Sequence, residues 1–186
     1  MAIMKTNYVF KDKDERKVAK DFIRYIEHRP GKDHEQMWRT LFGDEGRPLG
    51  RWQAFRFVDE APKGRYFYRI VVSPDSEKED TQRDLPLREI IKETMRTLQE
   101  RRDTPVEWIA AIHDDHTDKR HIHALAVVKG RLKKEEIEAL RDSATAEAQL
   151  QREAHDLMRD VAQLQQYRQE QEWEPEPELG EDVWER

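Results

Sequence analysis

The chain has 186 residues, of which 36% are hydrophobic and 40% charged, with a formal net charge of −6 and no cysteine. This length is enough for one ordinary domain with a complete core and a smaller appendage. The lack of cysteine excludes disulfides and thiolate metal sites. No apolar run approaches the ~20 residues that span a bilayer, and the first residues lack the apolar core of a signal peptide. We therefore expect a cytoplasmic protein without membrane insertion.

Charge is distributed unevenly along the chain. Residues 135–186 contain 16 acidic and 5 basic residues, a net charge of −11, whereas residues 1–134 contain 24 acidic and 29 basic residues, a net charge of +5. The mildly basic first part is compatible with binding to phosphate groups, and the acidic second part is not. A nucleic-acid partner is therefore permitted by residues 1–134, although their charge alone does not require one.

Hydrophobic periodicity and turn residues predict mixed strands and helices. In chain order, we expect a strand over 5–10, a helix over 13–28, a strand over 65–73, a helix over 86–101, strands over 106–113 and 121–128, and a helical segment over 133–171. Residues 29–64 contain many glycines and prolines and are expected to be irregular. Whether residues 133–171 form one helix or two stays open.

These elements predict an α+β fold with a central, mainly antiparallel sheet, helices packed on one face, and a carboxy-terminal helical extension. The expected domain organisation is a first domain over 1–132, the helical extension over 133–171, and a disordered tail over 172–186. The tail is acidic and contains prolines, a composition typical of disordered chain. No internal repeat is visible.

Four of the seven histidines lie between positions 113 and 123. His121 and His123 share a strand face because alternate side chains point the same way. If the two neighbouring strands pair as a hairpin, His113 lies opposite His121 and Ala111 lies opposite His123. Opposed residues have Cβ atoms roughly 5 Å apart, so three imidazoles converge at one end of the sheet. A polar hairpin with three solvent-exposed histidines is the alternative.

Three neutral imidazoles favour a transition metal over calcium and leave coordination positions open for a substrate. Such an ion can stabilise charge that develops on a phosphoryl oxygen. The loop carboxylates Asp114, Asp115 and Asp118 could orient the imidazoles as hydrogen-bond acceptors.

The segment IHDDHTDKRHIHALAVV resembles motif III of plasmid mobilisation relaxases, which belong to the HUH endonuclease superfamily. YFYRIVVSP resembles the strand of motif II, and DFIRYIEHRPGKD resembles the early helix of motif I. The three segments span about residues 18–128. The resemblance implies site-specific nicking and strand transfer of single-stranded DNA at a transfer origin, during mobilisation of a plasmid or integrative element, together with other relaxosome or coupling proteins.

The resemblance also implies roles for individual residues. His113, His121 and His123 would bind a divalent metal ion, with Mn or Mg as the first expectation and Zn or Ni as alternatives. Tyr25 would be the nucleophile, forming a 5′-phosphotyrosine intermediate and a free 3′-hydroxyl. Ser73 would help to hold DNA.

Other roles come from the residues around these motifs. Asp115 is a candidate for orienting or deprotonating the tyrosine hydroxyl, because a phenol is a weak acid. The basic residues Arg24, Arg29 and Lys32 are candidates for phosphate contacts. Glu79 and Asp80 are expected to cap a loop rather than to bind the metal ion.

Three alternatives remain open. Tyr167, on the last helix, is the rival nucleophile, although its surroundings are acidic. The chain could instead be an inactive DNA-binding accessory protein on the same scaffold. It could also be a zinc-stabilised interaction module with no role for DNA.

Overall fold

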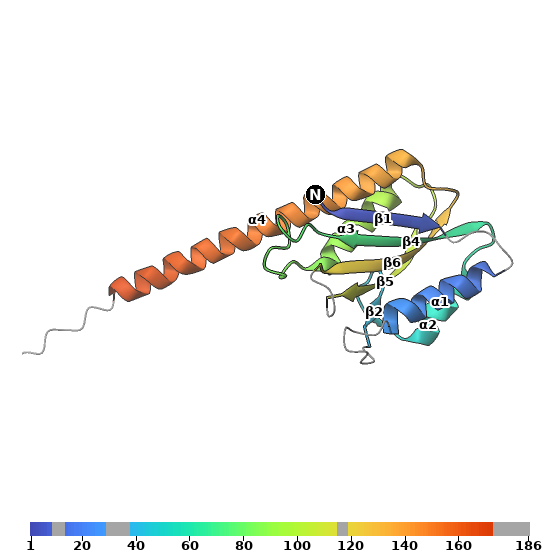
Figure 1. Cartoon of the computed structure of the whole chain (residues 1–186), viewed down its shortest axis with the longest axis horizontal. Helices are drawn as coiled ribbons and strands as arrows, with labels where there is room; N and C mark the ends of the chain where they lie inside the picture. Colours follow the sequence, from blue (N-terminus) through green and yellow to red (C-terminus); the bar gives the residue numbers. More distant parts are fainter. Residues whose placement is uncertain (9–13, 29–37, 115–118, 173–186) are drawn as a thin grey trace, which may run out of the picture. The chain divides into compact units, whose positions relative to one another are not determined.

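The computed structural model describes residues 1–8, 14–28, 38–114 and 119–172. Six strands and four helices lie in this part of the chain (Figure 1). In order they are β1 (Ile3–Tyr8), α1 (Glu15–His28), β2 (Leu41–Phe42), β3 (Pro48–Leu49), α2 (Arg51–Glu60), β4 (Arg65–Ser73), α3 (Leu87–Glu100), β5 (Glu107–His113), β6 (His121–Lys129) and α4 (Lys134–Glu172).

The strands form one sheet in the order β1-β4-β6-β5-β2-β3, and every neighbouring pair is antiparallel. β6 lies between its hairpin partner β5 and the earlier strand β4. The predicted α+β class, with a central antiparallel sheet and a carboxy-terminal helical extension, is confirmed.

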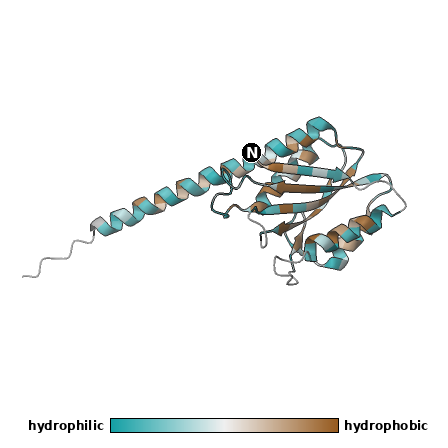
Figure 2. Ribbon diagram, in the orientation of Figure 1, coloured by the Kyte–Doolittle hydropathy of each residue, from teal (hydrophilic) through white to brown (hydrophobic). Residues whose placement is uncertain are grey.

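Helices cover both faces of the sheet, and not one face as the sequence pattern indicated. One core cluster joins the sheet to α3 and the start of α4, and a second joins it to α1 and α2. The reason lies in β6, whose residues 122–128 are all buried. A strand that is apolar at consecutive positions must bury both of its faces. Figure 2 shows the hydrophobic residues gathered in the strands.

Residues 29–64 contain more regular structure than predicted. The described part of this segment forms the short hairpin β2–β3 and the ten-residue helix α2. Ala54 and Val58, four residues apart, are both fully buried on the inner side of α2. The surrounding glycines and prolines led to the prediction of irregular structure, because two apolar positions are too few to indicate a helix.

The last helix is continuous from Lys134 to Glu172, which answers the question of one helix or two. The chain divides into two compact units, residues 1–152 and 153–186. This division comes later than the expected boundary after 132, because Leu140, Ala144 and Ala148 are buried in the core of the first unit. The described part of the second unit is helical and exposed, and residues 173–186 of the expected disordered tail lie outside the described residues. Among the described helices, none has the length and apolar character needed to cross a membrane.

Candidate metal centre

Three histidines meet at one end of the sheet. His113 on β5 pairs directly with His121 on β6, and Ala111 pairs with His123, as the hairpin register predicted. The three ring centroids lie 4.6–5.2 Å from one another, and one nitrogen of each ring lies within 4.8 Å of the others. The predicted convergence of the three imidazoles is confirmed, and the alternative of three merely exposed rings is excluded.

The three rings differ in burial. His113 is fully buried and His123 is 8% exposed, while His121 is half-buried. Helix α1 contacts the first two rings, through the Ile26 carbonyl at His113 and the Phe22 ring at His123, and His121 is the most exposed of the three. This arrangement leaves an open side where a substrate could approach an ion.

Backbone carbonyls select the tautomers of two of these rings. His113 Nε2 lies 2.9 Å from the carbonyl oxygen of Ile26, and His121 Nδ1 lies 3.0 Å from that of Lys119. A carbonyl oxygen only accepts hydrogen bonds, so each of these ring nitrogens carries the proton and donates it. In the neutral rings the lone pairs are therefore on Nδ1 of His113 and Nε2 of His121.

This donor set fits a divalent transition metal. Imidazole ligands in metal sites commonly donate their second ring nitrogen to a carbonyl or carboxylate, which fixes the ring and its tautomer. Three imidazolium cations about 5 Å apart would repel one another, which favours neutral rings that can bind an ion. The group could hold one ion through three nitrogens.

Tyr25 lies beside the metal group. Helix α1 packs against β5 and β6 through Ile23 and Ile26, which are both fully buried, and this orientation brings Tyr25 to the end of the sheet. The Tyr25 ring lies 5.8 Å from that of His123 and 6.4 Å from that of His113, and 43% of the residue is exposed. The structure thus places Tyr25 beside the histidine group, on the side of His113 and His123.

A network of polar residues anchors the start of β6. Ser73 donates a hydrogen bond from Oγ to the carbonyl oxygen of Arg120 at 2.9 Å. The Arg120 guanidinium pairs with the buried carboxylate of Asp80 at 3.2 Å, and the same carboxylate accepts the backbone N–H of Leu85. Asp80 therefore caps the loop, as expected, and the network holds the residue that precedes His121. Sequence patterns did not reveal this role for Arg120.

A second basic residue on the site face was also missed. The Arg69 guanidinium of β4 lies 5.1 Å from the ring centroid of Phe22, and the Phe22 ring in turn contacts His123. Arg69 lies in a strand of aromatic and β-branched residues, so its sequence context did not mark it as a site residue. It lies on the same face as His123 because it is two residues from Val71, which pairs with His123. It contributes positive charge close to the metal group.

The other predicted site residues have separate positions. Arg24 pairs with Asp21 and lies over the ring of Phe55, 4.9 Å from its centroid, so its contacts are with α1 and α2 rather than with the histidines. The backbone carbonyl of Asp114 accepts a hydrogen bond from Arg83. The ring contacts that lie within the described residues include the backbone carbonyls of Ile26 and Lys119. Asp115, Asp118, Arg29 and Lys32 lie outside those residues. Tyr167 belongs to the second compact unit and is 61% exposed.

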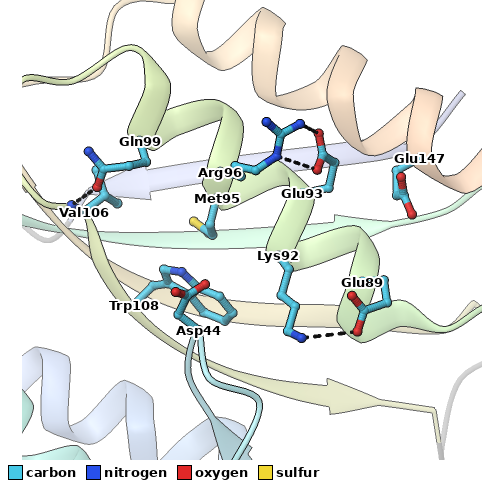
Figure 3. A pocket seen from close by; sticks show the side chains of 10 residues that line it. All are labelled: Asp44, Glu89, Lys92, Glu93, Met95, Arg96, Gln99, Val106, Trp108 and Glu147. Atoms are coloured by element: carbon cyan, nitrogen blue, oxygen red, sulfur yellow. Dashed lines mark hydrogen bonds and ion pairs between the residues drawn. The ribbon is translucent and has the colours of Figure 1, made fainter.

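A hollow of about 370 Å³ lies between α3, α4 and Trp108, against the α3 side of the sheet (Figure 3). Its charged groups are largely paired among themselves, as in the contacts of Lys92 with Glu89 and of Arg96 with Glu93. The side chain of Gln99 accepts the backbone N–H of Val106. These contacts belong to the packing of the helix, and the hollow shares no residue with the histidine group.

No protein-family model matches the chain, and neither a curated protein nor a solved structure is significantly similar to it.

Proposed function

We propose that the chain is a metal-dependent endonuclease that nicks and rejoins single-stranded DNA through Tyr25. The observation that carries this proposal is the position of Tyr25, whose exposed ring contacts those of His113 and His123 in a group able to hold a divalent ion. Exposure matters because a nucleophile must reach a phosphodiester in solvent. The resemblance of three segments to relaxase motifs assigns the same residues to the same chemistry.

In the proposed reaction, the hydroxyl oxygen of Tyr25 attacks the scissile phosphorus and the bond from phosphorus to the 3′ oxygen breaks. The phenol proton passes to a base, for which Asp115 is the sequence candidate, and the leaving 3′ oxygen gains a proton. A divalent ion held by the three histidines would neutralise negative charge on the non-bridging phosphate oxygens. Because the phosphotyrosyl bond retains the energy of the broken linkage, a later 3′-hydroxyl can reverse the step without ATP.

Single-stranded DNA is the proposed substrate because a duplex would have to melt before one phosphate could enter a site between a helix and a sheet end. In the cell, the proposed process is mobilisation of a plasmid or integrative element, with a transfer origin as the target. The positive net charge of residues 1–134 supports binding to a phosphate backbone.

The test is incubation of the full chain with a pool of random single-stranded oligonucleotides and Mn²⁺, followed by denaturing electrophoresis. We expect a covalent protein–DNA adduct in the wild type, its complete loss in Tyr25→Phe, and its retention in Tyr167→Phe. Loss in Tyr167→Phe instead would assign the nucleophile to α4. Metal-dependent DNA binding with no adduct would favour the accessory protein over the enzyme.

A further inference from the structure

A second hollow, of about 240 Å³, adjoins the metal group on the same face of the sheet. Six residues line it: Ile3, Lys5, Val71, Ser73, Lys119 and His121. It shares only His121 with the three histidines, and all of its residues belong to the first compact unit. No acidic side chain of the described residues lines it.

Strand pairing explains why these residues lie together. On this face Lys5 of β1 pairs with Val71 of β4, and Val71 pairs in turn with His123 of β6, so the three form one row across the sheet. Ile3 and Ser73 are paired in the next row, beside His121. The core cluster under α1 and α2 includes residues of β2, β4, β5 and β6 and, within the described part of the chain, none of β1. Ile3 is accordingly 49% exposed.

The lining has the chemistry of a nucleotide site. Ile3 and Val71 provide an aliphatic floor for the flat face of a base, and Lys5 and Lys119 are exposed ammonium groups for phosphate. Exposed apolar area beside lysines, with no carboxylate among the described lining residues, suits a ligand that is apolar on one side and anionic on the other. A floor of aliphatic side chains offers no hydrogen bonds to base edges, so the site would accept different bases.

The position of the hollow relative to Tyr25 indicates on which side of the scissile phosphate a nucleotide bound in the hollow would lie. Tyr25 contacts the rings of His113 and His123, whereas the hollow borders His121. In phosphoryl transfer the attacking and leaving oxygens are roughly in line on opposite sides of the phosphorus. Because Tyr25 lies on one side of the histidine group, the leaving 3′ oxygen would lie on the opposite side, where the hollow borders His121.

We infer that the hollow beside His121 binds the nucleotide on the 3′-hydroxyl side of the scissile phosphate. This inference rests on the proposed function for the direction of the strand, although the nucleotide site itself is defined by the lining residues alone. After cleavage, the hollow would retain the end that carries the free 3′-hydroxyl, ready for the rejoining step.

The first test compares two mononucleotides by NMR of the Zn²⁺-loaded full chain with labelled methyl groups. Thymidine 3′-monophosphate carries its phosphate where the scissile phosphate would be, and thymidine 5′-monophosphate does not. We expect both to shift the methyl signals of Ile3 and Val71, and the 3′ isomer to bind about tenfold more tightly because its phosphate reaches the metal group. Methyl signals of Leu125, buried under α1, should not move.

The second test measures binding of random-sequence single-stranded DNA to the metal-free chain at several salt concentrations. Lys5→Ala should lower the slope of log affinity against log salt by about 0.7, the value of one phosphate contact on a single strand. Ile3→Ala should weaken binding a few-fold without changing the slope. Lys63 is also exposed and lies outside the hollow, so Lys63→Ala is the matched control and should change neither.

The outcomes separate this inference from the proposed nuclease activity. Absence of methyl shifts at Ile3 and Val71 overturns the nucleotide site, even if Tyr25 forms an adduct. Tighter binding of the 5′ isomer overturns the assigned strand direction. Methyl shifts with the expected preference support the site, even where no covalent adduct forms. A Lys5→Ala slope equal to that of Lys63→Ala removes Lys5 from the site.

Discussion

The two faces of the sheet use neighbouring residues of the same strand for different purposes. On β6, Ile122 and Ala124 point into the core with α3 and α4, while His121 and His123 point to the other face. The first face is closed by helices along its length, whereas the second is covered by α1 and α2 over only part of its width. Period-two alternation of side chains lets one strand contribute to stability on one side and to chemistry on the other.

The largest expected effect comes from the closed face. Ile122, which lies between His121 and His123 in sequence, is fully buried on the opposite face, and Ile122→Ala should lower the free energy of unfolding by about 2–5 kcal/mol. Urea unfolding of the metal-free chain measures this change. His123→Ala, on the other face of the same strand, should cost less than half as much, because burial of a polar ring stabilises the fold less than burial of an aliphatic side chain. Equal losses would mean that the histidine face is also a stability core.

Metal binding should make the histidine face contribute to the stability of the fold as well. At a Zn²⁺ concentration 100 times the dissociation constant, binding to the folded state alone adds about 2.7 kcal/mol of stability. For a chain of this size, that raises the melting temperature by about 5–10 °C. Differential scanning calorimetry with and without a chelator measures the shift.

The matched variants for this metal effect are neighbours on β6. His123→Ala should abolish the shift in melting temperature, and Ile122→Val, which keeps the three rings, should retain it. A shift that survives in His123→Ala would place the bound ion elsewhere in the chain. A chelator that unfolds the wild type outright would favour the zinc-stabilised module instead.

The same contrast explains what could be predicted from sequence. The histidine group was predictable because strand alternation and a seven-residue connection between two apolar strands determine which side chains face each other. Tyr25 was singled out by the motif resemblance, and its role stays a prediction. Its position beside the rings follows from the apolar stripe of α1, which determines which side of that helix meets the sheet.

Contacts made by backbone groups, and contacts between segments far apart in the sequence, were not predictable in the same way. The carbonyls of Ile26 and Lys119 that orient two rings are backbone groups and leave no trace in residue type. The hollow beside His121 depends on β1 pairing with β4, which are separated by more than fifty residues. Helices on both faces were missed because the buried run of β6 was interpreted as one strand with one covered face.

A smaller effect on the free energy of unfolding is expected from the hydrogen bond between Ser73 and Arg120, next to the histidine group. Ser73 donates its hydroxyl hydrogen to the carbonyl of Arg120, so Ser73→Ala should cost about 1 kcal/mol of unfolding free energy. Metal affinity should fall as well, because Arg120 precedes His121. Urea unfolding and calorimetric titration with Zn²⁺ measure the two changes. Weaker DNA binding with unchanged stability and metal affinity would instead indicate the direct DNA contact that the motif resemblance implies.

The smallest effect concerns pH at the end of α1. Burial, with the nearby charges of Arg51 and Arg39, lowers the pKa of His28 below its usual 6.5, and Glu27 opposes this. The folded chain therefore takes up this proton at lower pH than the unfolded chain, so His28 reduces stability as the pH falls below about 6.5. The effect should be less than that of Ser73→Ala, because 25% of the His28 side chain remains exposed.

An NMR titration of the His28 ring tests this at one residue. The wild-type midpoint should lie below 6.5, and Arg51→Gln should raise it, because it removes a positive charge and leaves the Glu27 carboxylate, which Arg51 contacts at 2.7 Å, to act on the ring alone. Glu27→Gln should lower the midpoint further, since it removes the Glu27 charge, which favours the protonated ring. Opposite shifts in the two variants identify local charge as the cause, whereas shifts of the same sign would mean that the contact of His28 with Trp38 had been lost in both.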